Sequence, residues 1–129
     1  MDKSEIREEA RLYFVPFFLG DNSLSHKLSN KIYVKHKIVS YILDTKKSII
    51  DFLDFTSVFW LLYHTQEDGI ILTQLKYLSK QFPYTLPILI PCTKEYTELV
   101  ERNKDFLEAY FIISNPDDII HSSPLNVIP

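Results

Sequence analysis

The sequence contains very little cysteine and glycine. Cys92 is the single cysteine, which excludes an internal disulfide framework and a zinc site built from several cysteines. Gly20 and Gly69 are the two glycines among 129 residues, so neither a glycine-rich dinucleotide fingerprint nor a glycine-rich phosphate loop can be written. A lone cysteine fits a reducing compartment, and we therefore expect a cytoplasmic protein. Because the glycine-rich cofactor motifs are missing, we expect no bound cofactor.

Long hydrophobic runs and an excess of one charge are also missing. The longest apolar runs, Leu12–Leu19 and Val58–Tyr63, are far shorter than the roughly 20 residues that span a bilayer. Residues 1–11 are rich in Glu and Arg and contain no apolar core, unlike a secretory signal. The 14 basic and 17 acidic residues leave a net charge of -3, which gives no electrostatic footprint for nucleic acid. We expect neither a membrane segment nor a nucleic-acid partner.

Apolar segments of two kinds alternate along the chain. Short runs rich in β-branched and aromatic residues predict strands, and apolar residues spaced three and four apart predict helices. The composition, 46% hydrophobic and 14% aromatic, is sufficient for a buried core. The predicted strands cover residues 12–19, 38–43, 58–63, 86–90 and 110–113, and the predicted helices cover residues 23–36, 48–55, 71–82, 93–107 and 116–123.

Two strands carry specific expectations. Pro16 cannot donate to a sheet ladder, so the first strand should lie at an edge there or end near Val15. Val58–Tyr63 shows no polar alternation, which is typical of a strand covered by helices on both faces, and we expect it at the centre of the sheet.

Regular alternation of strands and helices implies a parallel sheet, because each parallel connection needs a crossover. We therefore predict one α/β domain over residues 1–129, with a doubly wound, flavodoxin-like sheet of five strands and helices on both faces. We expect residues 1–11 to form a polar extension or a partial helix and residues 124–129 to form a tail.

Ligands of such folds bind at the carboxyl ends of the strands. Candidate residues there are His64 after the third strand, Cys92 and Thr93 after the fourth, and Asn115 after the fifth. His64 and Cys92 are the one base and nucleophile pair that could meet, although an isolated cysteine at a strand end is more often a packed residue. The four histidines have no paired spacing that favours a metal, so no metal is expected.

The latter half of the chain resembles a response-regulator receiver domain. The resemblance rests on Val58–Tyr63, the pair Asp68-Gly69, the segment Leu86–Thr93, and the segment Ala109–Ile113 followed by Pro116. In receivers an acidic-glycine pair opens the third helix, a Leu-Pro pair often opens the fourth strand, and a proline follows the fifth. The earlier half agrees in element order and length.

The chain departs from the receiver pattern where receivers carry their chemistry. The acidic pair after the first strand is replaced by Val15–Phe18, with Asp21 nearby, and the phosphorylated aspartate after the third strand by Leu61–His64. Ser114 and Asn115 stand where receivers have a lysine, whereas Thr93 matches the hydroxyl residue after the fourth strand. The resemblance therefore implies a pseudo-receiver without a magnesium site or a phosphoryl acceptor.

We expect a non-catalytic regulatory module that binds a protein partner, a neighbouring domain or a second copy of itself without phosphorylation. The alternative is a small-molecule or enzymatic site at the strand ends. Receivers commonly use the face around the fourth helix and fifth strand, and the tail after a short last helix is apolar. The candidate interaction residues are Tyr96, Tyr110, Leu125 and Ile128.

Overall fold

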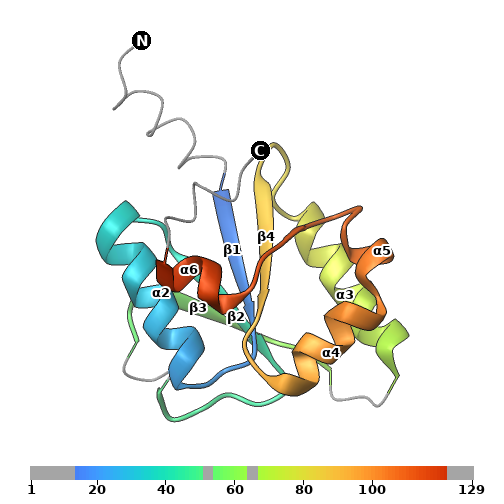
Figure 1. The fold of residues 1–129 in the computed structure, drawn as a ribbon, viewed down its shortest axis with the longest axis horizontal. Coiled ribbons are helices and arrows are strands. Elements are labelled where there is room, and N and C mark those ends of the chain that lie inside the picture. The colour runs from blue at the N-terminus through green and yellow to red at the C-terminus, as the bar shows by residue number, and fades with distance from the viewer. Residues whose placement is uncertain (1–13, 51–53, 64–66, 122–129) are drawn as a thin grey trace.

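The computed structural model describes residues 14–50, 54–63 and 67–121. It contains one sheet of five parallel strands in the order β3-β2-β1-β4-β5, with helices packed on both sides (Figure 1). The strands are β1 (Phe14–Leu19), β2 (Ser40–Asp44), β3 (Ser57–Leu61), β4 (Leu86–Pro91) and β5 (Ile112–Ile113). This architecture confirms the predicted fold class, a doubly wound parallel sheet with two helical layers.

Helices α2 (Ser23–His36) and α6 (Pro116–His121) cover one face of the sheet, and α3 (Asp68–Lys80), α4 (Lys94–Arg102) and α5 (Lys104–Leu107) cover the other. Successive side chains of a strand point to opposite faces. Phe17 and Leu19 of β1 accordingly join the α3–α5 side of the core, whereas Phe14 and Phe18 join the α2–α6 side. Both faces of β1 are therefore buried.

The helix starts follow the expected capping rules. Asn22 and Ser25 form a reciprocal capping box at α2, and Thr93 accepts the Tyr96 backbone N–H at α4. Pro116 occupies the first position of α6, directly after Asn115 in the sequence. The predicted helix over 23–36 and the short last helix are confirmed.

Pro16 lies within the central strand, so the expectation of an edge position or of a strand end near Val15 was wrong. β1 pairs with β4 along its whole length, but its pairing with β2 begins at Phe17. No ladder hydrogen bond to β2 is needed at residue 16, which is why a proline is tolerated between two strands.

β3 is an edge strand, and the prediction that Val58–Tyr63 lies at the centre was wrong. Within the part of the chain that the structure describes, β3 pairs with β2 alone, whereas in the flavodoxin-like order 2-1-3-4-5 the third strand lies beside the first. Val58, Trp60 and Leu61 are 44%, 38% and 62% exposed. Continuous hydrophobicity here reflects an uncovered surface and not burial on both faces.

The predicted helix over 48–55 is also absent from the described residues of that connection, 45–50 and 54–56, which contain no α-helix. Ile49 and Phe55, two apolar residues of that predicted helix, are 82% and 92% exposed, and residues 51–53 lie outside the described residues. Ser48 is bound through its backbone N–H and hydroxyl to Asp21, which fixes the start of the connection against β1.

Candidate functional site

The strand order reverses between β1 and β4, because the chain leaves β1 toward β2 on one side and later returns to β4 on the other. Ligands of open α/β sheets bind beside this point. Here the two loops bond to each other: the Cys92 N–H donates to the Leu19 carbonyl at 2.8 Å, and the Asn22 amide donates to the Cys92 carbonyl at 3.0 Å. The chain's own groups therefore close the crevice between the two loops.

Gly20 permits this close approach. Its φ is +115°, a conformation that residues with a side chain rarely adopt, and a Cβ added there would lie 2.9 Å from the Thr93 methyl carbon. The loop after β1 can thus lie against the loop after β4 only with glycine at this position.

A buried charge cluster lies beside this contact, formed by Asp21, His26 and Asp54. The His26 Nε2 atom is 2.5 Å from an Asp21 carboxylate oxygen, and Nδ1 is 2.5 Å from an Asp54 oxygen. The side chains of His26, Asp21 and Asp54 are 6%, 0% and 7% exposed. A protonated imidazole donates through both ring nitrogens, so it can bond to both carboxylates at once.

The surroundings of the cluster shift its pKa values in opposite directions. Burial alone lowers the pKa of His26, but the hydrogen bonds to Asp54 and Asp21 and their negative charges outweigh burial, so the pKa is raised above its ordinary value. Burial raises the pKa of Asp54, but hydrogen bonds from Thr56, His26 and Ser57 outweigh it and lower the pKa overall. Both shifts favour the charged pair.

Asp44 at the end of β2 extends the hydrogen-bonded network toward α4. Its carboxylate accepts the Asp21 N–H at 2.7 Å, the Thr45 N–H at 2.7 Å and the Tyr96 hydroxyl at 2.9 Å. Burial, together with the Asp44 charge, raises the pKa of the Tyr96 phenol. The phenol therefore remains a hydrogen-bond donor at neutral pH.

These contacts indicate what the cluster does chemically. Asp21 also accepts two hydrogen bonds from Ser48, and Asp54 accepts bonds from Thr56 and Ser57, so the carboxylate oxygens are engaged by protein donors. Within residues 14–50, 54–63 and 67–121, no group of three or more His, Cys, Asp and Glu side chains is placed to hold a metal ion. The cluster ties the ends of β1 and β2 to α2 and to the β2–β3 connection.

The strand-end residues proposed from the sequence lie in different environments. Cys92 is buried with its thiol near the Ile90 carbonyl, and burial raises its pKa to about 12, which holds it as the unreactive thiol. Thr93 caps α4, and the Asn115 side chain accepts the Asp118 N–H at 3.1 Å. His64 lies outside the described residues.

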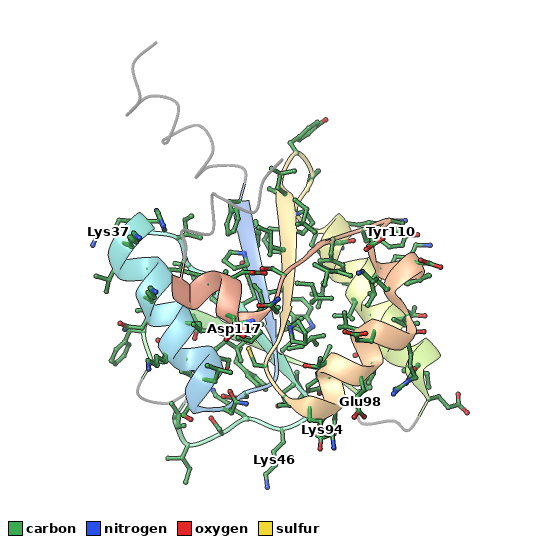
Figure 2. All side chains as sticks on the ribbon, viewed as in Figure 1. Lys37, Lys46, Lys94, Glu98, Tyr110 and Asp117 are labelled. Carbon is green, nitrogen blue, oxygen red and sulfur yellow. The ribbon has the colours of Figure 1, made fainter. Side chains whose placement is uncertain are left out.

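The four proposed interaction residues do not form one described face. Tyr96 is half-buried and bonds to Asp44 near the carboxyl end of the sheet. Tyr110 packs against Phe106, with the Lys76 ammonium 5.4 Å from its ring centre, and lies at the opposite end of this helical layer from Lys94 (Figure 2). Leu125 and Ile128 lie outside the described residues.

The sequence did not reveal the charge cluster. The receiver pattern directs attention to the ends of the first and third strands, where Asp21 is the nearby carboxylate, whereas the structure adds Asp44 after β2 and Asp54 from the following connection. Asp44 lies beside Asp21 because β2, and not β3, is the neighbour of β1.

None of the described helices is long and apolar enough to cross a membrane. No family model matches the chain, and neither curated proteins nor solved structures give a match to it.

Proposed function

We propose that the domain is a non-catalytic regulatory module, receiver-like in its alternation of strands and helices but not in its strand order, that binds a protein partner without being phosphorylated. The observation that supports this function best is the exposed edge of β3. Large apolar side chains are exposed along the strand and just beyond it, where Tyr63 is 77% exposed. Exposed apolar surface of this kind marks interaction sites in soluble proteins.

The edge of β3 lacks the features that usually prevent strand pairing. Natural edge strands carry charged residues, prolines or bulges that block the approach of another strand. Residues 57–61 are Ser-Val-Phe-Trp-Leu and contain neither a charge nor a proline, and among the described strands β3 pairs with β2 alone. An extended segment of a partner can therefore add to this edge through main-chain hydrogen bonds.

Charge beside the edge favours a different protein over a second copy. The Lys47 ammonium lies 5.9 Å from the centre of the Phe59 ring, at the middle of β3. If two copies of the chain paired their β3 strands symmetrically about Phe59, their two Lys47 side chains would lie close together and repel each other. An acidic residue on the strand of a different protein would instead attract Lys47. We propose a partner segment with alternating apolar residues and at least one acidic residue.

Selection from a random peptide display library tests this function with the domain alone. We expect the enriched peptides to alternate apolar residues and to include an acidic residue. Val58→Lys, which places a charge on the edge, should weaken their binding by at least about tenfold, measured by fluorescence anisotropy.

Val34→Lys provides the matched control, because Val34 is a 64% exposed valine on α2 and not on the edge. It should leave peptide affinity unchanged. Equal losses in the two variants, or the absence of enriched peptides, contradict the proposal. Dimers in light scattering that Val58→Lys dissolves would instead identify a second copy as the partner.

The non-phosphorylated state gives a separate prediction. Acetyl phosphate with Mg²⁺ should add no phosphoryl group in intact-mass measurements, because Leu62 and Tyr63 follow β3 and the Asp44 oxygens accept hydrogen bonds from Asp21 and Tyr96. A receiver that carries its phosphate-accepting aspartate, treated in parallel, should gain mass. A stoichiometric gain that Asp44→Asn abolishes contradicts the pseudo-receiver hypothesis.

A further inference from the structure

A groove lies at the opposite edge of the sheet from β3. It has a volume of about 480 Å³, within the range of small-ligand and peptide pockets. Its lining residues come from α4 and α5 on one wall and from α6 on the other, with Pro91 at the carboxyl end of β4 between them. The residues of β5, Ile112 and Ile113, form part of its lining.

The backbone of β5 is open on the side away from β4. Ile112 and Ile113 pair with Ile88 and Leu89 of β4, and β5 is the last strand in the sheet order. No strand among the described residues pairs with its outer edge. This edge is two residues long and offers few backbone donors and acceptors, so an extended peptide that adds to it must also be held by the groove beside it.

The groove combines apolar and acidic surface. Val100 and Phe111 are almost completely buried beneath it, and Ile112 and Ile113 are half-buried. Three carboxylates, from Glu101, Glu108 and Asp118, and one ammonium, from Lys104, also line it, so the lining has a net charge of -2. Its carboxylates come from both walls.

We infer that this groove binds an extended peptide in which basic and apolar residues alternate. The peptide backbone pairs with the outer edge of β5, apolar side chains pack on the half-buried Ile112 and Ile113, and basic side chains face the carboxylates of the walls. Opposite charges across such a contact set specificity and accelerate association. This site is independent of the proposed function, because β3 and β5 are the two opposite edges of the sheet.

Three labelled peptides test the inference on the intact domain by fluorescence anisotropy: an alternating lysine-valine peptide, its glutamate-valine counterpart, and the lysine-valine peptide with N-methylated backbone amides. The lysine-valine peptide should bind and the glutamate-valine peptide should not. N-methylation should weaken binding at least about tenfold, because it removes the donors that strand pairing needs while keeping the charge.

Charge reversal on α4 supplies the matched pair of variants. Glu101 lines the groove, whereas Glu98 is an exposed glutamate of the same helix that does not (Figure 2). Glu101→Lys should weaken the lysine-valine peptide about fivefold or more, and Glu98→Lys should change its affinity by less than about twofold. Unchanged thermal unfolding of both variants would show that the fold is intact.

Several results overturn the inference. Equal binding of the N-methylated peptide would show attraction by charge alone, without strand pairing at β5. Equal losses from Glu98→Lys and Glu101→Lys would show general attraction to an acidic surface. Failure of all three peptides to bind would show that the groove is not a peptide site. Val58→Lys, which alters the β3 edge, should leave the affinity for the lysine-valine peptide unchanged.

Discussion

Replacing His26 by alanine should lower the free energy of unfolding by about 3–5 kcal/mol, measured by urea denaturation. The variant removes the positive charge that lies between Asp21 and Asp54, 2.5 Å from a carboxylate oxygen of each. Both carboxylates are less than a tenth exposed. Breaking a buried ion pair is costly because the remaining charges stay out of water without a partner.

Two further variants separate this explanation from a simple loss of packing. Lys27→Ala, at the exposed neighbour of His26 on α2, should change stability by less than about 0.5 kcal/mol. Adding Asp54→Asn to His26→Ala should cost clearly less than the sum of the two single changes, because it removes one of the stranded charges. Strict additivity of the two changes would contradict a charge-based explanation.

The same cluster gives wild-type stability a defined pH dependence. The raised pKa of His26 means that its contribution is fully present below its ordinary pKa of about 6.5 and is lost as the pH rises through the higher folded value. The lowered pKa of Asp54 means that its contribution is present above its ordinary pKa of about 4 and is lost as the pH falls through the lower folded value. His26→Ala should remove the alkaline decline in stability.

Gly20→Ala should destabilise the fold by at least about 2 kcal/mol, measured in the same denaturation experiment. A backbone conformation such as φ +115° costs a residue with a side chain about 1–3 kcal/mol. The new methyl group would also lie 2.9 Å from the Thr93 methyl carbon, and overpacking of this kind typically costs about 1–3 kcal/mol more. The two loops that close the strand-end crevice would have to move apart.

The other glycine is the matched control for Gly20. Gly69 lies near the start of α3, and a Cβ built there meets nothing within 4 Å, so Gly69→Ala should stabilise the domain by about 0.4–1 kcal/mol. Adding Thr93→Ser to Gly20→Ala should recover part of the loss, because serine keeps the capping hydroxyl but lacks the methyl group. Equal effects at the two glycines would contradict this account.

Local patterns along the chain predicted most helices and strands correctly. Apolar spacing predicted α2 with either Asn22 or Ser23 as its cap, and Asn22 is the cap in the structure. Asn115-Pro116 predicted the start of α6. The spacing from Ile71 to Phe82 gave α3 to within a few residues. Such signals depend on neighbours in the sequence, and alternation of the two element types was enough to indicate a doubly wound parallel sheet.

The pattern failed where an apolar run has two physical explanations. Val58–Tyr63 has the composition of a strand buried on both faces, yet β3 lies at an edge with its apolar side chains exposed. Periodicity measures how hydrophobic a segment is and cannot show whether the protein itself covers it. The segment predicted as a helix over 48–55 shows the same ambiguity, because its apolar residues Ile49 and Phe55 are exposed.

By itself, the sequence determined the fold class, most element boundaries and the caps, because these depend on interactions between residues close along the chain. Strand order was decided by tertiary structure alone, and with it the meeting of Asp21, His26 and Asp54 and the position of Asp44 beside Asp21. His26 and Asp54 are 28 residues apart, and no local pattern links them. Their contact arises because β2 packs beside β1, which brings the β2–β3 connection against the first turn of α2.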